Sequence, residues 1–518
     1  MARLESAGLL ERLKQHVDIH PGRTAVIWRN ERVTYIDLWQ RSTHLARNLE
    51  ELVVFEPILN KRVLIRLENE VSLACAYFAC LRAGMSPILT DPEASEPQHF
   101  SIATATSAQF LIDQSSYDRI LRRVPKRAVG RLAALPENGA PQVIFSTAGT
   151  AGSPKLIEHS LDGLMLGNEL LRSGFSSFLK GGVNSLTMTA SSARHHGRGL
   201  IQAARRQKVW MSSMPLFRIA GHSLFLQAVL GGETFISGSG LTANDLIVSA
   251  RANNVSVLAI SPWVGELLLR TRIDTNLRHL LVIGVGSDRP SRDLDERLKS
   301  VFRCPVVVGY GSTELGGGVT ATNVYGRSSR QQGAAGLPFK GIAVRVVDES
   351  GRQLSTGKAG TIECQMPEAM RGRVIAGGGV DQFQIDRPRT SEVWVRTGDR
   401  GWQGEDGQLH VLGRSDDLIV RGGSKIDPVE VEQTLERHQS IERAGVVGVD
   451  SKVGAVRVVA FCVMKGDDEC STDILRKFCS AFLPHEAIPH RIHPVNELPL
   501  THEGKVQRAV LRQWAAAI

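Results

Sequence analysis

The sequence QVIFSTAGTAGSPK at residues 142–155 sets the pattern from which the fold can be predicted. The apolar run VIF is typical of a buried strand, and a loop of glycines and small hydroxyl residues follows it, ending at Lys155. Backbone N–H groups, hydroxyls and an ammonium bind polyphosphates, and glycines let the backbone approach the phosphate oxygens. Pro154 before the lysine, and the lack of Gly-Lys-Ser/Thr, exclude a Walker loop. The stretch therefore predicts a phosphate-binding loop, with an ordinary surface connection as the alternative.

Two later strand ends carry side chains that suit a nucleotide. In VVVGYGSTE at 306–314, Tyr310 can stack on a base and Glu314 can present a carboxylate to magnesium. In VRTGD at 395–399, Asp399 at a predicted strand end can hold both hydroxyls of a ribose, and Arg414 can contact the same sugar or a phosphate. Taken singly, each segment is also consistent with a routine strand end or turn.

A further cation lies near the C-terminus, in PLTHEGKVQR at residues 499–508. Pro499 and Gly504 mark this run as an exposed loop, from which Lys505 could reach an anionic centre. A lysine in full contact with solvent is the alternative. The run gains weight only from the order of the segments upstream of it.

The composition is that of a globular protein. The chain has 518 residues, of which 42% are hydrophobic and 22% charged, and its length suggests about three structural units. Charged residues at Glu11, Arg12 and Lys14 argue against a secretory signal, and no window approaches ~18 consecutive apolar residues. We therefore expect a cytoplasmic protein with no membrane span.

Cysteine usage and net charge narrow the possible functions. The seven cysteines are scattered without a CxxC pair, so neither disulfides nor metal sites built on them are expected. The net charge of +9 is partly concentrated at residues 194–208, where Trp210 is the one aromatic residue nearby. Because nucleic-acid grooves stack bases on aromatic rings, we expect a basic loop or helix face there, and no specific nucleic acid.

Alternating strand-like and helical patterns predict an α/β fold. Strand-like runs lie at 62–67, 110–113, 142–145, 256–260 and 281–284, and a helix that is apolar almost all round lies at 71–82. From 343–348 onward the strands lie closer together, which predicts a small antiparallel, barrel-like portion. After the charged segment 413–417, strands at 444–449 and 456–464 and helices at 428–435 and 474–482 predict a separate α+β domain.

Together, the segments STAGTAGSPK, YGSTE, TGD, GRSDD and the terminal GK resemble the adenylate-forming superfamily of acyl-CoA synthetases, adenylation domains and luciferases, in their order and approximate spacing. The resemblance covers nearly the whole chain. It implies a large N-terminal domain of doubly wound sheets plus the barrel-like portion at residues 1–415, and a mobile C-terminal domain at 416–518. It also implies activation of a carboxylic acid by Mg-ATP, release of pyrophosphate, and transfer of the acyl group, usually to a thiol.

The resemblance assigns roles to individual positions. Nucleotide contacts are implied for Ser146, Thr147, Gly149, Thr150, Gly152, Lys155, Gly286, Ser287, Tyr310, Gly311, Asp399 and Arg414. Thr313 would touch the α-phosphate, and Glu314 would bind magnesium. Lys505 would bridge the attacking carboxylate oxygen and the α-phosphate, which orients two anions and neutralises charge on phosphorus.

The second step of the family's reaction gives the C-terminal domain its implied motion. Asp416 matches the hinge position, about which the small domain would withdraw Lys505 and bring in the segment 421–425. Gly423 matches the glycine that lines the pantetheine tunnel, where a side chain would obstruct the thiol.

Some positions depart from the family pattern. Arg218 and Gly221 match the segment at the carboxylate pocket, but Arg218 replaces a common histidine or aromatic residue. Arg218 either pairs with a second negative group on the substrate or covers the pocket mouth. Ala151 replaces a second threonine in the phosphate loop, so one phosphate hydrogen bond is missing there. These departures indicate a specialised acid, such as an aromatic acid of secondary metabolism.

The leading hypothesis is an ATP-dependent acid–thiol ligase that makes an acyl- or aryl-CoA and uses ATP, Mg²⁺ and CoA. The first alternative is adenylation followed by transfer to a carrier-protein phosphopantetheine or to an amine. A degenerate homologue that binds nucleotide without turnover comes next, although Glu314, Asp399, Arg414 and Lys505 argue against it. A basic nucleic-acid-binding protein comes last. The oligomeric state, monomer or homodimer, and the identity of the acid stay open.

Overall fold

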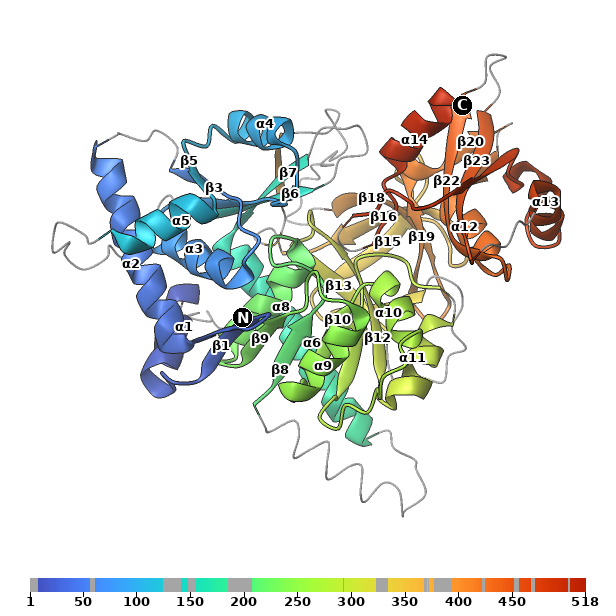
Figure 1. The fold of residues 1–518 in the computed structure, drawn as a ribbon. Helices are drawn as coiled ribbons and strands as arrows, with labels where there is room; N and C mark the ends of the chain where they lie inside the picture. Colours follow the sequence, from blue (N-terminus) through green and yellow to red (C-terminus); the bar gives the residue numbers. More distant parts are fainter. Residues whose placement is uncertain are drawn as a thin grey trace.

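The computed structural model describes residues 8–55, 61–123, 141–147, 155–184, 207–291, 293–322, 334–367, 370, 372–376, 394–421, 424–450, 456–466, 471–501 and 504–518. Two β-sheets with covering helices form the larger part of the molecule, and the elements after about residue 420 gather on one side of it (Figure 1). Among the described helices, none has both the length and the apolar character that crossing a membrane requires.

The first sheet, as far as the chain is described, contains six strands. In spatial order they are β17 (Arg373–Ala376), β7 (Lys155–Ser160), β6 (Gln142–Thr147), β4 (Ser86–Leu89), β3 (Arg62–Ile65) and β5 (Phe110–Ile112). Strands β3, β4, β5 and β6 are parallel, and β7 turns back antiparallel to β6. The predicted phosphate loop is the connection between β6 and β7, and its residues 148–154 lie outside the described residues.

The second sheet contains thirteen strands within the described ranges. In spatial order they are β15 (Ala343–Val347), β16 (Gly360–Gln365), β18 (Trp394–Gln403), β19 (Leu409–Arg414), β14 (Ala334–Pro338), β13 (Gly317–Ala321), β12 (Val306–Ser312), β11 (Val282–Val285), β10 (Val257–Ile260), β8 (Val209–Ser212), β9 (Thr234–Ser237), β1 (Thr24–Trp28) and β2 (Glu31–Thr34). The run from β12 to β1 is parallel, and the run from β13 to β15 is antiparallel. The antiparallel strands occupy the region of the predicted barrel-like portion and continue the larger sheet.

Helices cover both sheets and separate them. They are α1 (Leu9–Ile19), α2 (Tyr35–Phe55), α3 (Glu70–Arg82), α4 (Glu96–Thr106), α5 (Gln114–Arg122), α6 (Leu161–Asn184), α8 (Ile219–Leu230), α9 (Ala243–Ala252), α10 (Pro262–Leu269) and α11 (Leu294–Phe302). Every residue of α3 is buried, because the helix contacts strands of both sheets as well as α2. The helix predicted at 71–82 from its all-round apolar surface is therefore confirmed.

The C-terminal elements form cores of their own. They are β20 (Ile419–Arg421), β21 (Ser424–Ile426), α12 (Pro428–Glu436), β22 (Ile441–Asp450), β23 (Val456–Met464), α13 (Thr472–Ser480), β24 (Arg491–Val495) and α14 (Arg508–Ala517). Strands β22, β23 and β24 form a sheet, with one apolar cluster under α12 and α13 and another under α14. The buried residues of both clusters all lie at position 419 or later; the domain boundary at residue 415 stays a prediction.

The predicted strands and helices lie within one or two residues of their observed bounds, except that β22 begins three residues before the predicted strand at 444–449. The prediction that Asp399 ends a strand is wrong, because β18 continues to Gln403. From Asp399 onward, β18 pairs with β19 as far as Gln403.

Truncation of Phe461 tests the apolar cluster that lies under α14. Its side chain is 1% exposed and packs edge-on against Trp514 of α14. We expect Phe461→Ala to lower the free energy of unfolding of this part by about 3–5 kcal/mol, because the truncation leaves a cavity. Hydrogen exchange of the β22 and β23 amides measures the loss. Ile474→Ala, at a side chain that is 55% exposed, is the control, and equal exchange in both variants would contradict the assignment of this core.

Candidate active site

A cavity of about 1280 Å³ opens where the thirteen-stranded sheet meets the C-terminal elements. Of the positions predicted from the sequence, its lining contains Thr147, Lys155, Arg218, Gly286, Ser287, Tyr310, Gly311, Thr313, Glu314, Asp399, Arg414 and Lys505. These residues come from segments spread over more than 350 positions, so the fold brings the predicted motifs together. The predicted positions Gly149, Thr150, Gly152 and Gly423 lie outside the described residues.

Lys155 and Glu314 form a buried ion pair in the cavity wall. Lys155 Nζ donates to Glu314 Oε1 at 2.6 Å, and the two side chains are 16% and 8% exposed. Burial alone would raise the pKa of Glu314, but the Lys155 ammonium outweighs it and holds that pKa below its usual value. The Glu314 carboxylate is therefore ionised at neutral pH. The Lys155 ammonium lies beside it because the start of β7 and the end of β12 are close together.

A histidine contacts the backbone of the loop that carries Thr313 and Glu314. His159 of β7 is fully buried, and its Nε2 lies 2.6 Å from the Thr313 carbonyl oxygen. Burial lowers the pKa of His159, so the neutral ring donates this hydrogen bond. Gly311 allows the same turn to close, since a Cβ there would overlap the Gly317 carbonyl of β13. The backbone around Thr313 is thus fixed before any ligand binds.

Asp399 occupies the next part of the wall, between two donors. Tyr310 Oη donates to Asp399 Oδ2 at 2.6 Å, and Arg414 Nη1 lies 3.7 Å from Oδ1. The Arg414 contact follows from the strand register, in which Asp399 of β18 is paired with Arg414 of β19. Burial raises the pKa of Asp399, while Arg414 and Tyr310 oppose the shift. Both oxygens can exchange these neighbours for the hydroxyls of a sugar.

Lys505 enters the cavity from the C-terminal elements, on a loop that rests against α10. Gly504 has a left-handed φ of 80° and faces Trp263 so closely that a Cβ would overlap the indole ring. Arg443 lies over the same ring at 3.9 Å and donates to the Gly504 carbonyl. The positive charge of Lys505 acts on Asp399 across the cavity. Lys505 is thus directed at the same site as the nucleotide-binding candidates.

Arg218 lies at the start of α8, beside the apolar part of the cavity. Its Nη1 donates to the Ser146 carbonyl at 3.1 Å, and its Nη2 lies 3.4 Å from Asp91 Oδ2. Trp210 and Leu224 line the cavity on this side. Arg218 therefore bridges the end of β6 to the segment after β4.

Two predicted residues support the site without lining it. Ser146 is buried, and its carbonyl accepts the Arg218 hydrogen bond. Gly221 is buried in the first turn of α8, where a Cβ would overlap the carbonyl oxygens of Met214 and Pro215. Neither Ser146 nor Gly221 is among the residues that line the cavity. Gly221 thus permits a close approach of two backbone segments.

The donor set of the cavity agrees with a magnesium ion held mainly by phosphates. Within the described ranges, no group of three or more His, Cys, Asp or Glu side chains could hold a metal ion. Mg²⁺ commonly takes one or two carboxylates and completes its shell with phosphate oxygens and water. Glu314 is a carboxylate in the lining of the cavity.

Sequence reasoning missed His159 and Trp263. Each acts through a backbone contact with a residue far along the chain, His159 on Thr313 and Trp263 on Gly504. Single aromatic or imidazole side chains in apolar surroundings carry no periodic signal for such a contact. The one sequence signal near these contacts is Gly504, which is interpreted only as the mark of an exposed loop.

Comparison with protein families identifies two matching family models. The AMP-binding enzyme model matches residues 13–372, and the AMP-binding enzyme C-terminal domain model matches residues 430–505. The first match alone spans more than half of the chain. The boundary predicted at residue 415 lies in the unmatched stretch between the two.

Individual relatives match over nearly the whole chain. The 2-succinylbenzoate–CoA ligase of Bacillus licheniformis is 27% identical over 96% of this chain and 98% of its own length. The o-succinylbenzoate CoA synthetase of Bacillus subtilis, solved with its acyl-adenylate intermediate, has a TM-score of 0.79 at 21% identity and covers 97% of each chain. A benzoate CoA ligase of Burkholderia xenovorans has a TM-score of 0.77 at 21% identity, covering 98% of this chain and 99% of its own. The two structures share the fold.

The buried ion pair predicts a pH-dependent stability. Lys155→Met leaves Glu314 as a buried, uncompensated carboxylate, so we expect a loss of about 3 kcal/mol at neutral pH, measured by thermal unfolding. The pKa of Glu314 is lowered in the folded state, so the pair stabilises above the unfolded pKa and its contribution is lost as pH falls. The deficit of the variant should therefore shrink in acid. Adding Glu314→Gln should restore most of the stability at neutral pH, and a double variant as unstable as the single one would contradict the pairing.

Proposed function

This chain belongs to the AMP-binding enzyme family, and we propose that it activates a carboxylic acid with ATP and passes the acyl group to the thiol of CoA. In the first step a carboxylate oxygen attacks the α-phosphorus of ATP. An acyl adenylate forms and pyrophosphate leaves. In the second step the CoA thiol displaces AMP and forms a thioester. The observation that carries the proposal is one cavity lined by Lys155, Glu314, Asp399, Arg414 and Lys505.

Different residues of the cavity suit different parts of the nucleotide. Asp399 and Arg414, paired across two strands, suit the ribose, and Tyr310 beside them suits the base. Lys155 suits the β- and γ-phosphates, which would replace Glu314 as its anionic partner. Glu314, released from that pair, would hold magnesium. The ion shields phosphate charge and orients the leaving pyrophosphate.

Lys505 supplies the charge at the reacting atoms. A cation between the substrate carboxylate and the α-phosphate offsets the repulsion of two anions and stabilises the charge that develops on phosphorus. No proton transfer is needed for this role. The Thr313 hydroxyl would contact the same phosphate; Thr313 lines the cavity, and its carbonyl is hydrogen-bonded to His159.

The C-terminal part, residues 416–518, serves both steps by changing its orientation. In this structure Lys505 lines the cavity, so the observed orientation suits adenylate formation. Rotation about Asp416 in the segment Ser415–Asp417 would withdraw Lys505 and bring the segment 421–425 to the site. Gly423, which lies outside the described residues, would then border the path of the thiol.

The acid fits an aromatic class. Trp210, Leu224 and Val257 give the inner cavity an apolar lining, which suits a planar hydrocarbon body. The related ligases described above act on 2-succinylbenzoate and benzoate. Arg218 has Asp91 as an anionic neighbour, so its charge is already compensated. We therefore propose that the substrate needs one carboxylate, the reacting one.

Pyrophosphate release with a broad panel of carboxylic acids tests the proposed function. We expect Mg-ATP-dependent release with aromatic acids, followed by CoA-dependent formation of a thioester. Parallel reactions with a phosphopantetheine-loaded carrier and with simple amines identify the acceptor. Release with an acid but discharge only to a carrier or an amine would overturn the CoA assignment. No release with any acid would overturn the enzyme itself.

Lys505→Ala separates the two steps. We expect adenylation to fall roughly 10²-fold or more, since an electrostatic contact made in the transition state is lost. Thioester formation from added acyl adenylate and CoA should be preserved, because that step uses the other orientation. Quenched-flow assays of each half-reaction measure both rates. Lys358→Ala, at an exposed turn lysine, is the control, and an equal loss in both half-reactions would contradict the role of Lys505.

Arg218→Gln tests the class of acid. If Arg218 covers the pocket mouth, the variant should raise KM for a monocarboxylic aromatic acid and for a dicarboxylic one by similar factors, within roughly threefold of each other. If Arg218 binds a second carboxylate, the dicarboxylic acid alone should lose roughly tenfold or more. Pyrophosphate release with a matched pair of acids measures the difference. A selective loss for the dicarboxylic acid would contradict our proposal of a single required carboxylate.

A further inference from the structure

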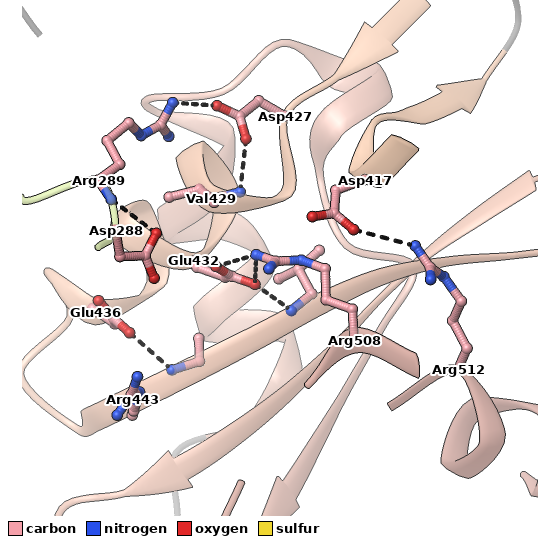
Figure 2. Close-up of polar contacts among 12 residues, drawn as sticks. Asp288, Arg289, Asp417, Asp427, Val429, Glu432, Glu436, Arg443, Arg508 and Arg512 are labelled. Carbon is pink, nitrogen blue, oxygen red and sulfur yellow. Dashed lines mark hydrogen bonds and ion pairs between the residues drawn. The ribbon is translucent and has the colours of Figure 1, made fainter. Parts of the chain in front are cut away.

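A buried ion pair joins the loop after β11 to the first turn of α12 (Figure 2). Arg289 Nη1 lies 2.6 Å from Asp427 Oδ2 and also donates to the Leu412 carbonyl of β19. The two side chains are 7% and 15% exposed. One partner belongs to the large sheet and the other to the C-terminal part, with the hinge segment between them in sequence.

Asp427 divides its two oxygens between two tasks. Its Oδ1 accepts a hydrogen bond from the Val429 backbone N–H at 2.9 Å, which caps the N-terminus of α12. Its Oδ2 takes Arg289. The ion pair therefore fixes the N-terminal end of α12. Because a helix is rigid, the rest of α12 is held in place with that end.

The same helix holds the segment that carries Lys505. Glu432, on the second turn of α12, accepts from Arg508 Nη2 at 2.7 Å with both of its oxygens and from the Val446 N–H at 2.8 Å. Arg508 follows Lys505 by three positions and begins α14. Figure 2 shows this series of contacts running from Arg289 through Asp427 and Glu432 to Arg508.

Two other ion pairs cross the same boundary at the surface. Arg270 lies 2.8 Å from Glu442, with side chains 44% and 40% exposed, and Lys425 lies 2.9 Å from Glu349, with side chains 44% and 90% exposed. Exposed pairs of this kind contribute little, because water and salt screen them. The Arg289–Asp427 pair differs by its burial, so its loss leaves a charge that solvent does not compensate.

We propose that Arg289 and Asp427 are positioning residues for adenylation, because their ion pair holds the C-terminal part in the orientation that puts Lys505 in the cavity. The inference rests on the proposed function above. Among the described residues, Arg289 Nε and Nη2 are buried without hydrogen-bond partners. Asp427 is thus the counter-charge of a guanidinium that this orientation shields from water. Rotation of the C-terminal part breaks the pair and lets water reach both groups.

Asp427→Asn removes the charge and keeps the helix cap, because asparagine caps helices as well as aspartate does. We expect adenylation to slow roughly 30-fold or more, the lower end of the cost of truncating one partner of a buried ion pair. Thioester formation from added acyl adenylate and CoA should keep its rate or rise. The acid is the one that gives the fastest pyrophosphate release in the panel. Equal slowing of both half-reactions, or of neither, would overturn the proposal.

A double variant and a surface control sharpen the result. With Arg289→Gln added to Asp427→Asn, no buried charge is left unpaired, so adenylation should be no slower than in the single Asp427→Asn variant. Arg270→Ala removes an exposed pair across the same boundary and should change neither half-reaction more than roughly twofold. A double variant whose losses add, or an Arg270→Ala variant as slow as Asp427→Asn, would also overturn the proposal.

A distance measurement tests the ion pair without catalysis. Spin labels are attached at Val248→Cys in α9 and at Ile474→Cys in α13, two side chains that are exposed in the parent. The full chain also carries Cys470→Ser. The labels report the distance between the large part of the molecule and the C-terminal part. We expect Asp427→Asn to add a second distance population that the parent lacks, with and without Mg-ATP. An unchanged distribution would overturn the positioning role. If the wild-type chain releases no pyrophosphate with any acid, but Asp427→Asn still adds the second distance population, the result would instead contradict the proposed function and leave the role of the pair intact.

Discussion

The ion pair between Lys155 and Glu314 is the contact on which the cavity depends. It joins two residues 159 positions apart and brings the start of β7, in one sheet, to the end of β12, in the other. A buried charge is tolerated only beside its opposite, so the two sheets are held at one separation. Mg-ATP can replace both partners of this pair: a phosphate can take the place of Glu314 beside the Lys155 ammonium, and the magnesium ion can take the place of Lys155 beside the Glu314 carboxylate. The ion pair and the proposed complex with Mg-ATP therefore satisfy one constraint with different groups.

Asp399 follows the same logic with weaker partners. Tyr310 and Arg414 contact its two oxygens, but burial still raises the pKa of its carboxyl group. A site that keeps a partly compensated carboxylate loses some stability for the sake of binding, as is common where function requires polar groups in a protected place. The strand register that sets Asp399 opposite Arg414 preserves this arrangement whether or not a sugar is present.

The sequence predicted the elements and the motifs but few of the contacts between them. Periodicity and apolar runs located α3 and some of the strands, because burial on both faces leaves a local pattern. The sequence predicted a strand end at Asp399, yet pairing with β19 continues β18 to Gln403, since tertiary pairing overrides a local preference. The contacts of Trp263 with Gly504 and of Arg289 with Asp427 join distant segments, and no spacing along the chain encodes them.

A C-terminal part that serves two reactions needs an interface strong enough to place one lysine and weak enough to release it. A broad apolar interface would hold one orientation permanently, because burial of apolar area is lost as a whole on separation. The contacts described here are instead local and polar: one buried ion pair, exposed ion pairs, and an indole ring against a glycine. Separation hydrates both members of each ion pair, so much of the free energy lost from the contact is returned by water. Glu432 and Arg508 stay within the C-terminal part, so its internal geometry survives the change. The placement of Lys505 is therefore a property of the whole domain, set at its boundary and carried to the lysine by α12.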